Sequence, residues 1–512
     1  MTGRSLRSGW SRLIGERGFP WTVFITVSLV YGAYSVLRIQ LHLATAYDLG
    51  IFDQAVWRYA HFQAPFVTLK GDAYTIWADH FHPIIVLWAP LYWVWDDVRA
   101  LVIGQALVIG AAAFPVWRFV RRRWGTSPWA KAFVVYMLVA WPVFHLADFD
   151  VHEIAFAVPL LAWVIDAVDR RSVRALLISA GLLLCVREDM GVLVFVVGVI
   201  WLLWRPAGAS DPPAAAGEAV KPPWFRGRPL TRVDWAAGVG LMVGGLAVFA
   251  LVTMVVIPHF APDGYQYWDY PALGATPGAA LRTLLTRPWI LVTGLFVPTM
   301  KVGTWLLLLA PVGFLSLRSP YALLALPIMA ERMLAAREFL WQPIFHYDAP
   351  VWIVLALAAV DGFARLPASW RRRLGSRPIL VAALAGVIAL GGIAAAVQRW
   401  QPHVKDGTGM GAALAAIPAN TCVVADNHAA VFLTHTNRVT VPGASTHRQD
   451  FVVIDFAWPN SSPPPFSWTS YRTYDEAIAQ GFTEVSRQDA IAVLQAPDYT
   501  GPDPAACGPG AR

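Results

Sequence analysis

Two aspartates near the start of the chain are the strongest candidates for acid–base chemistry. The segment YDLGIFDQ, residues 47–54, follows an apolar run and contains Asp48 and Asp53. A carboxylate can accept the proton of an attacking hydroxyl group, which is general-base catalysis. On a helix, five residues separate two side chains by about 140°, so these carboxylates would not share one face. We expect Asp48 to be the base and any role of Asp53 to differ, whereas capping of a following helix is the structural alternative for Asp48.

A short histidine-containing segment follows in the same polar stretch. Asp79, His80 and His82 could bind a divalent cation such as Mg²⁺ or Mn²⁺ through carboxylate and imidazole groups. The His-x-His spacing without a defined third ligand is a weak metal signal, so hydrogen-bonded loop histidines are the favoured alternative. Asp148 and Asp150 form an Asp-x-Asp pair of the kind found in some metal sites, which is also common by chance in acidic loops. The sequence therefore establishes no cofactor.

Charged and aromatic residues from several further segments could hold a substrate. Arg332 and Arg337 are the best phosphate candidates, because arginine grips phosphate through two parallel hydrogen bonds. Their structural alternative is extension of the side chain to a lipid–water interface. Arg187, Glu188 and Asp189 could instead form an ion-pair network that holds two half-helices. The candidate substrate- or phosphate-binding residues are His80, His82, His152, Glu153, Arg187, Glu188, Arg332, Arg337, His346 and Tyr347.

The composition identifies the setting of these residues. The chain has 512 residues, of which 57% are hydrophobic and 14% charged. Soluble chains carry about 25% charged residues, and disordered chains are poor in apolar residues, so both classes are excluded. Many apolar runs approach the length of about 20 residues that crosses a bilayer. The net charge of +7 comes from arginines clustered in short loops, which is typical of the cytoplasmic side of a membrane protein rather than of nucleic-acid binding.

The positive-inside rule predicts the topology. Residues 1–18 carry four arginines and are expected in the cytoplasm, and a first crossing follows over 19–37. Residues 38–97 would form a long external loop, in which 83–95 is too short to span and is expected in the outer interface. The Pro-, Ala- and Gly-rich residues 205–230 are typical of a flexible cytoplasmic linker. Further crossings are predicted near 98–118, 129–147, 154–168, 173–186, 190–204, 234–257, 302–317, 320–331, 349–365 and 379–397.

The chain changes character after the last crossing. About eleven crossings make residues 19–399 an all-α polytopic membrane domain and place residues 400–512 outside the cytoplasm. This tail is predicted to be a small α/β domain. Its predicted elements are strands over 421–426 and 451–456 and helices over 474–480 and 487–494. An external position would permit a Cys422–Cys507 disulfide, although the sequence does not show whether the geometry allows one.

The topology places the candidate residues on one side of the membrane. Four outward segments carry carboxylates, imidazoles and guanidiniums. Ionisable groups at the membrane ends of helices cost free energy, so their presence indicates a function. One shared polar cavity is the economical interpretation. Such a cavity suits a lipid-linked substrate, with its tail among the helices and its phosphate against arginine. Sugar transfer from a polyprenyl phosphate would use a carboxylate as base and positive charge at the departing phosphate.

The first-loop segment at 47–54 resembles the DUF2079 family of bacterial membrane proteins. The His80-Phe81-His82-Pro83 run, the turn at 149–153, the Arg187-Glu188-Asp189 break and His346-Tyr347 share this resemblance. That family resembles the GT-C glycosyltransferases, which implies a GT-C-like fold, a polyprenyl-phosphate sugar as substrate and Asp48 or Asp53 as the carboxylate. It also implies a bacterial inner-membrane protein with an extracytoplasmic C-terminal domain. An acidic pair directly after the first helix, present in some GT-C enzymes, is missing because Leu49 follows Asp48.

Two other classes of function remain as alternatives. A secondary transporter could use Asp48, Arg187 and Glu188 as a relay, but such proteins tend to contain paired broken helices, and only one break, at 187–189, is evident. A membrane scaffold that presents residues 400–512 would not account for the polar loops. The expected partners are membrane lipids and the polyprenyl-phosphate sugar, without nucleic acid, whereas the acceptor and the oligomeric state do not follow from the sequence.

Overall fold

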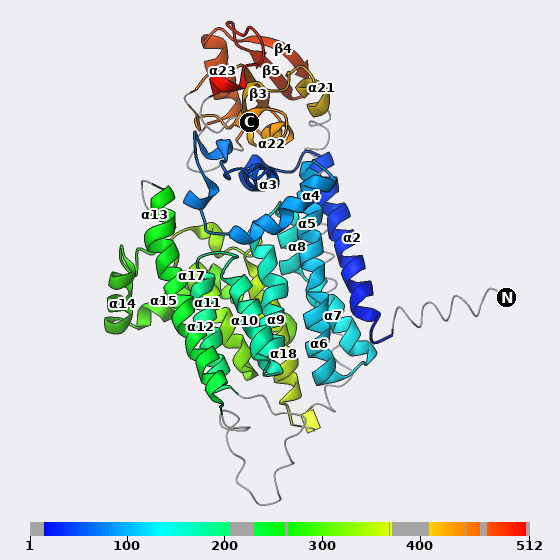
Figure 1. Ribbon diagram of the computed structural model, residues 1–512, viewed down its shortest axis with the longest axis vertical. Coiled ribbons are helices and arrows are strands. Elements are labelled where there is room, and N and C mark those ends of the chain that lie inside the picture. The colour runs from blue at the N-terminus through cyan, green and yellow to red at the C-terminus, as the bar shows by residue number, and fades with distance from the viewer. Residues whose placement is uncertain are drawn as a thin grey trace, which may run out of the picture.

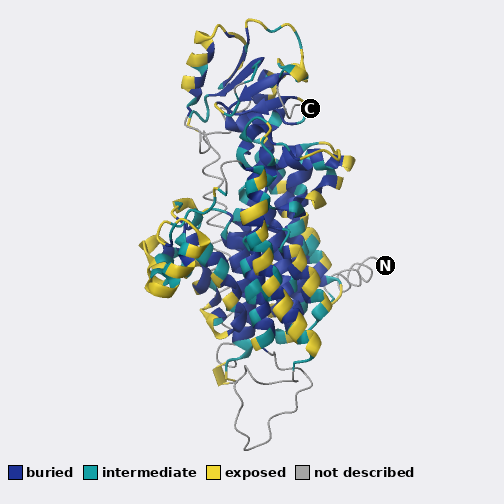
Figure 2. Ribbon diagram, turned by 60° about the vertical axis from the view of Figure 1, so that its left-hand side comes forward, coloured by how far each residue is buried: buried dark blue, intermediate teal, exposed yellow. Residues whose placement is uncertain are grey.

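Most of the described chain forms a helical bundle, and the C-terminal residues form a small sheet unit at one end of it (Figure 1). The structure is a computed structural model, and it describes residues 15–204, 230–261, 265–367, 369–370, 409–445, 447–460 and 468–507. The predicted crossing at 379–397, residues 1–14 and all but the last residue of the predicted linker at 205–230 lie outside the described residues. Figure 2 shows that buried residues fill the interior of both the bundle and the sheet unit.

The bundle helices begin and end near the predicted boundaries, although several are short. The first predicted crossing is confirmed as a helix of 22 residues, α2. The local sequence explains where two of the helices begin. Ser127 caps the N-terminus of α7, and Thr231 and Asp234 form a reciprocal capping box at the N-terminus of α12. The helices are α2 (Phe19–Gln40), α5 (Val98–Ala111), α6 (Ala113–Trp124), α7 (Pro128–Val139), α8 (Trp141–Asp148), α9 (Ala157–Asp169), α10 (Val173–Leu183), α11 (Met190–Leu203), α12 (Arg232–Leu251), α13 (Ile257–Phe260), α14 (Pro277–Thr286), α15 (Trp289–Phe296), α16 (Thr299–Leu309), α17 (Ala325–Leu334) and α18 (Asp348–Ala364).

The prediction of about eleven crossings is not confirmed. Within the described residues, four helical segments are long and apolar enough to cross a membrane, or five if the pair α15–α16, bent by 78°, is counted as one span. The other helices at predicted crossings are shorter than the roughly 20 residues that a bilayer needs. For example, α10 has 11 residues and α18 has 17, and 15 positions of α18 are buried against neighbouring helices. The four segments are Phe19–Gln40, Val98–Trp124, Pro128–Asp148 and Arg232–Phe260.

Glycines allow α11 and α12 to pack at very short range. A Cβ atom added at Gly198 would lie 2.6 Å from the carbonyl oxygen of Gly238, and one added at Gly191 would lie 2.5 Å from that of Gly245. Each helix therefore places two glycines, seven residues apart, against the backbone of the other. Small residues at helix interfaces allow this close approach within membranes. The opposite face of α12 exposes large apolar side chains such as Val243.

The first loop is ordered and lies between the bundle and the sheet unit. It contains a tight turn at Ala46–Gly50, then α3 (Ile51–Ala60) and, later, a 3-10 segment at Pro83–Trp88 that continues into α4 (Ala89–Val94). The predicted short interfacial segment at 83–95 is thus helical. In Figure 1, α3 lies directly beneath the sheet unit and α4 lies against the top of the bundle.

The C-terminal unit, residues 409–507, contains one five-stranded sheet in the order β2-β1-β3-β5-β4. β1 pairs in parallel with β2 and β3, whereas β5 pairs antiparallel with β3 and β4. The predicted strands and the first predicted helix are confirmed as β1, β3 and α23. The bounds are α21 (Met410–Leu414), β1 (Cys422–Ala425), α22 (Asn427–Ala430), β2 (Arg438–Thr440), β3 (Phe451–Asp455), α23 (Ser470–Ala479), β4 (Thr483–Gln488) and β5 (Ile491–Gln495).

The predicted helix at 487–494 is wrong. These residues contain the end of β4, a two-residue turn and most of β5. Asp489 in the turn has a φ of 49°, which a continuing right-handed helix does not allow. The apolar residues of β5 are buried on both faces of the sheet, so the strand has no alternation that would have distinguished it from a helix.

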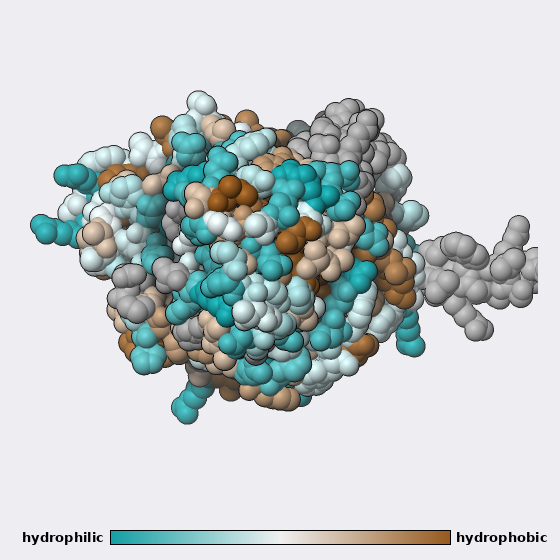
Figure 3. Space-filling view, turned by 90° about the horizontal axis from the view of Figure 1, so that it is seen from above, coloured by the Kyte–Doolittle hydropathy of each residue, from teal (hydrophilic) through white to brown (hydrophobic). Residues whose placement is uncertain are grey.

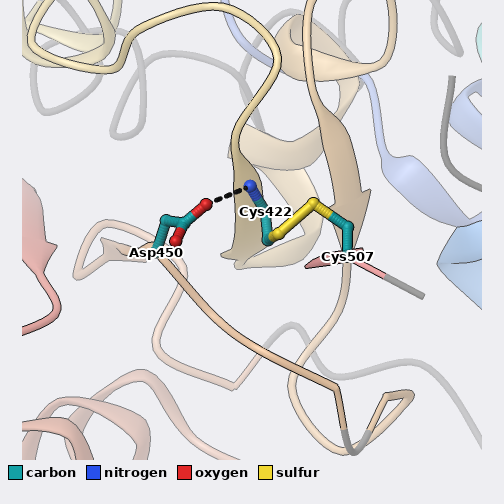
Figure 4. A group of neighbouring side chains, drawn as sticks. All are labelled: Cys422, Asp450 and Cys507. Carbon is teal, nitrogen blue, oxygen red and sulfur yellow. Dashed lines mark hydrogen bonds between the residues drawn. A yellow bond between two sulfur atoms is a disulfide. The ribbon is translucent and has the colours of Figure 1, made fainter. Parts of the chain in front are cut away.

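A disulfide joins the first residue of β1 to the end of the described chain. Figure 4 shows the bond between Cys422 and Cys507, with the Asp450 carboxylate accepting a hydrogen bond of 2.9 Å from the Cys422 backbone N–H. The two cysteines are 85 positions apart, and the segment that their bond closes includes the whole sheet. Seen from this end of the molecule, the surface is mostly hydrophilic, with scattered hydrophobic side chains (Figure 3).

Candidate functional site

A cavity of about 1340 Å³ lies between the first loop, the upper ends of the bundle helices and the C-terminal unit. It collects most of the candidate residues that are far apart in the sequence. Those that line it are Asp48, Asp79, His80, His82, His152, Glu153, Arg187, Glu188, Arg337, His346 and Tyr347. The structure thus brings together four separate polar segments, as expected for a single chamber.

The cavity has walls of different chemistry. Loop residues supply the polar wall, whereas the apolar residues that line the cavity come largely from helices. α11 contributes Val192 and Leu193, and α14 contributes Leu281 and Leu284. α14 is itself loosely packed, because Ala280 is its only buried residue. Such a chamber can hold a ligand that has a charged part and a hydrocarbon part.

Asp48 occupies the cavity in an unusual backbone conformation. Its φ is 105° and its ψ is −77°, in a region that residues with a side chain rarely adopt. Such conformations cost about 1–3 kcal/mol and cluster at functional sites, where the surrounding structure holds them. The side chain of Asp48 is 31% exposed, and one carboxylate oxygen lies 3.6 Å from Nε2 of His152. The strained turn therefore presents a carboxylate to the cavity.

Two stacked histidines lie beside Asp48. The rings of His152 and His346 are nearly parallel, with centroids 3.7 Å apart. Burial opposes protonation of His152, but the carboxylates of Asp48 and Glu153 raise its pKa to about 9. Burial and the positive charge of His152 lower the pKa of His346 well below its ordinary value. At neutral pH the pair consists of one imidazolium and one neutral imidazole.

Glu188 anchors the polar wall. Its carboxylate lies 2.7 Å from Nδ1 of His80 and accepts hydrogen bonds from the Phe81 N–H and the Tyr265 hydroxyl. Burial disfavours the charged form, but His80 and Arg187 lower the pKa of Glu188 to about 2. The same pairing raises the pKa of His80 against the effect of burial. Glu188 and His80 therefore form an ion pair at the cavity wall.

Two of the three proposed metal ligands, Asp79 and His80, are engaged by other side chains. The Asp79 carboxylate pairs with Lys70 Nζ at 2.6 Å and accepts a hydrogen bond from Tyr267, and His80 is engaged by Glu188. His82 is buried, and its Nδ1 has no hydrogen-bond partner among the described residues. In the described part of the chain, the one set of three candidate ligands grouped within 4.8 Å is that of Figure 4, whose two sulfurs are bonded to each other.

Two arginines present guanidinium groups to the cavity. Arg187 makes two hydrogen bonds to Asp189, of 2.7 and 2.9 Å, and lies 3.4 Å from Glu331. Arg337 lies 3.4 Å from Asp269, and its guanidinium is 5.0 Å from the ring centre of Tyr267. Each group has a carboxylate partner, so an anionic ligand would compete with Asp189 or Asp269 for these contacts.

Two candidate residues lie outside the cavity, contrary to expectation. Arg332 is 1% exposed, and its guanidinium pairs with Asp348 at 2.6 Å and donates to the carbonyl oxygens of Leu340 and Tyr347. It fastens the segment between α17 and α18, so it is not a phosphate ligand in this arrangement. The sequence could not distinguish this arginine from Arg337, because a buried partner 16 residues away leaves no local pattern.

Asp53 is the second candidate outside the cavity. It is completely buried in α3, where it accepts a hydrogen bond of 2.5 Å from the Tyr92 hydroxyl and lies 2.7 Å from Nε2 of His435. Burial disfavours ionisation, but His435 and the hydrogen bonds lower the pKa of Asp53. The contact joins the first loop to the C-terminal unit. Asp53 is therefore placed for docking of that unit and not for access to a substrate.

The Asp-x-Asp pair also has structural partners. Asp150 lies 2.7 Å from Arg38 at the end of α2 and accepts a hydrogen bond from the Thr45 N–H, and Asp148 accepts one from Tyr34. These contacts fix the point where the chain leaves α2 and enters the first loop. A metal at this pair would have to replace an arginine.

Several polar residues that line the cavity were not assigned to the site from the sequence, among them Lys70, Tyr267 and Asn427. Lys70 and Tyr267 hold Asp79, and Asn427 reaches the cavity from the C-terminal unit. Tyr267 lies between the predicted crossings at 234–257 and 302–317, in a segment that was not assigned to the site. Asn427 directly follows the predicted strand at 421–426, and the carboxyl ends of parallel strands are where α/β sheets place functional side chains, so this signal could have been used.

Comparisons with known proteins identify a family and a fold. The family model DUF2079, described as predicted membrane protein, matches residues 38–488. The structure of ArnT from Cupriavidus metallidurans bound to undecaprenyl phosphate is similar over 94% of this chain and 99% of that chain, with 14% identity and a TM-score of 0.52. The apo structure of that protein gives a TM-score of 0.44 at 14% identity, over 96% and 98% of the two chains. No curated protein matches the sequence. At 14% identity, the similarity to ArnT shows the fold alone.

Proposed function

We propose that this chain, which belongs to the DUF2079 family of predicted membrane proteins, transfers a sugar from a polyprenyl-phosphate donor to an acceptor at the outer face of a membrane. The observation that carries the proposal is the position of Asp48, whose carboxylate faces a large cavity from a strained turn. The shared fold supports a glycosyltransferase-like protein, and the undecaprenyl phosphate bound to ArnT supports a lipid-phosphate ligand.

The donor fits the two walls of the cavity. The hydrocarbon chain would lie along the apolar residues of α11 and α14, and the phosphate would lie near the loops. Arg187 and Arg337 would bind its oxygens in place of Asp189 and Asp269, because arginine pairs with phosphate in two-point geometry. His80, His82, Glu153, Glu188 and Tyr347 would shape the sugar subsite.

The reaction requires one proton acceptor and a stabilised leaving group. The Asp48 carboxylate would take the proton of the acceptor hydroxyl as its oxygen bonds to the anomeric carbon. The bond between that carbon and the phosphate oxygen breaks, and the phosphate leaves with the electron pair beside the guanidinium groups. Nε2 of His152, 3.6 Å from an oxygen of Asp48, would help to orient the base. No step is assigned to a metal, because two of the three candidate ligands, Asp79 and His80, are engaged by other side chains.

The chemistry is proposed for the extracytoplasmic side of a bacterial inner membrane. The cytoplasm rarely contains stable disulfides, so the Cys422–Cys507 bond favours an oxidising compartment for the C-terminal unit. The arginines of α6, at 121–123, lie at the end of the bundle away from this unit, which agrees with the positive-inside rule. A reporter fused after residue 400 should be active only outside the cytoplasm, and cytoplasmic activity would contradict this orientation.

The decisive experiment uses the purified protein in lipid nanodiscs with radiolabelled polyprenyl-phosphate sugars and an extract of envelope glycans as acceptors. Wild type should form a covalent product, and Asp48→Asn should lower the rate by about 10²–10⁴-fold, the usual contribution of a general base. Asp269→Asn is the matched control, because it changes a cavity carboxylate that has no proposed part in proton transfer. Full activity of Asp48→Asn would exclude Asp48 as base. Substrate flux in proteoliposomes without a product would instead favour a transporter.

A further inference from the structure

The C-terminal unit contributes a side chain to the cavity at the position of the proposed base. Asn427 is 7% exposed, and its Oδ1 accepts a hydrogen bond of 3.0 Å from the backbone N–H of Tyr47, the residue before Asp48. The two partners are 380 residues apart in the sequence. The strained turn is therefore held partly by a residue from another region of the fold.

Hydrogen-bonding groups lie on both sides of Tyr47. Its N–H donates to Asn427, and its carbonyl oxygen lies 2.5 Å from the hydroxyl oxygen of Thr45. Together they restrain the two peptide groups that flank Tyr47 and hence the direction from which the chain enters Asp48. A φ of 105° at Asp48 persists only where the surroundings determine it, since relaxation of the turn would relieve strain.

The position of Asn427 is fixed by the core of the sheet unit. The preceding Asp426 accepts hydrogen bonds from the Asp455 N–H at 2.8 Å, from the Trp468 indole at 3.1 Å and from the Ser470 hydroxyl at 2.6 Å. These contacts join the carboxyl ends of β1 and β3 to the start of α23. Asn427 thus projects from the rigid carboxyl edge of parallel strands, the edge at which α/β sheets commonly bind ligands. Here that edge contacts a loop of the same chain.

Other contacts fasten the unit to the first loop. The Thr68 hydroxyl donates to the Val439 carbonyl at 2.7 Å, and Arg438 lies 2.5 Å from Asp72. The edge strand β2 therefore docks beside the turn, and the position of Asn427 relative to the cavity is set by more than its own hydrogen bond.

We propose that Asn427 is a positioning residue for Asp48: docking of the C-terminal unit holds the Tyr47–Asp48 turn so that the Asp48 carboxylate faces the cavity. This inference rests on the proposed transferase function, in which Asp48 is the base. The unit would then be required for catalysis even though it supplies no reacting group.

Hydrogen exchange tests the restraint without any activity assay. In Asn427→Leu, which keeps the size of the side chain but removes its oxygen, amides in the peptide that covers residues 44–50 should exchange at least tenfold faster than in wild type. Asn460→Leu makes the same change at an exposed position of the same unit and should leave that peptide unchanged. Equal exchange in wild type and Asn427→Leu would overturn the proposal.

Kinetics test the consequence. We expect Asn427→Leu to lower kcat by about 100-fold, the scale of loss produced by a displacement of about 1 Å, with little change in the KM for the lipid donor. Asn427→Asp retains an acceptor oxygen and should stay within about tenfold of wild type, the cost of one weakened hydrogen bond of about 1.4 kcal/mol or less. A purely structural role would instead lower the unfolding temperature and leave kcat of the folded protein unchanged, which would reject positioning.

The two experiments separate the failure of the inference from that of the proposed function. If wild type forms no product with any polyprenyl-phosphate sugar, the transferase proposal fails, and faster exchange in Asn427→Leu would still establish the restraint on the turn. If wild type is active and Asn427→Leu has normal kcat, the positioning role fails and the transferase proposal stands.

Discussion

The imidazole rings of His152 and His346 stack with centroids 3.7 Å apart and planes inclined by 17°. Their pKa values move in opposite directions, because His152 faces the Asp48 carboxylate whereas His346 faces buried surroundings and the positive charge of His152. Two side chains of the same type thus have different protonation states at neutral pH. The pair makes both the stability of the fold and the charge beside Asp48 dependent on pH.

The first prediction concerns alkaline pH. The pKa of His152 is about 9 in the folded protein against an ordinary value of 6.5, so its stabilising effect is complete below about pH 6.5 and is lost as pH rises through about 9. In His152→Gln this component should be missing, and unfolding temperatures between pH 6.5 and 9.5 should fall less steeply than in wild type. Identical pH profiles for the two proteins would contradict a charged His152.

The second prediction concerns acid. The pKa of His346 is lowered, so the unfolded chain binds a proton at this residue more readily than the folded one, and stability should decrease as pH falls below about 6.5. His346→Phe keeps a ring against His152 but cannot be protonated. The decrease in unfolding temperature between pH 7 and pH 5 should therefore be smaller in His346→Phe than in wild type.

The third prediction tests the strain at Asp48. Asp48→Gly and Asp48→Ala both remove the carboxylate and its contact with His152, and they differ in how well they tolerate a φ of 105°. Glycine adopts positive φ freely, so Asp48→Gly should be the more stable variant. Its free energy of unfolding should exceed that of Asp48→Ala by about 1 kcal/mol. Both variants should lack transferase activity. Equal stability of the two variants would show that the turn relaxes when the carboxylate is absent.

The fourth prediction separates Arg332 from Arg337. Breaking a buried ion pair costs about 3–5 kcal/mol, so Arg332→Met should strongly lower the free energy of unfolding by leaving Asp348 without its partner. The double variant Arg332→Met/Asp348→Leu should recover most of this loss. Arg337→Met, at a partly exposed site, should change stability by about 1 kcal/mol or less while raising the KM for the lipid donor.

A comparable loss of stability in Arg332→Met and Arg337→Met would contradict the assignment of Arg332 to the core. Chemical denaturation in detergent micelles, followed by tryptophan fluorescence, provides the measurement. Circular dichroism before denaturation should show that each variant starts from the same helical content.

The sequence predicted which segments meet at the cavity but not the partners of each side chain. Asp48, His152 and Arg187 follow apolar helices on the same side of the bundle, and periodicity with charge was enough to place them together. Arg332 and Asp53 share the same local features, yet they turn towards buried partners at Asp348 and His435. These pairings depend on packing between distant elements, which a single sequence does not encode in its local patterns.

Element type was predictable where length or composition was decisive. The predictions of the 22-residue helix α2 and of the apolar strands β1 and β3 were correct. The residues of β5 were predicted to be helical, because a short buried apolar run fits the periodicity of a helix as well as that of a strand. The predicted number of crossings was not confirmed within the described residues, since buried helices such as α18 are as apolar as membrane spans but shorter. Hydropathy reflects exclusion from water, and it does not distinguish a helix that is covered by lipid from one that is covered by other helices.

The hydrogen bond between Tyr47 and Asn427 joins the beginning of the polypeptide to its final fifth. During synthesis, the loop that carries Asp48 emerges long before the sheet that restrains it. A nascent chain that has not yet reached Asn427 would contain the Asp48 carboxylate but not the side chain that accepts the hydrogen bond from its turn. The conformation of the turn at Asp48 is therefore completed only after a segment 380 residues further along the chain has been made and has docked.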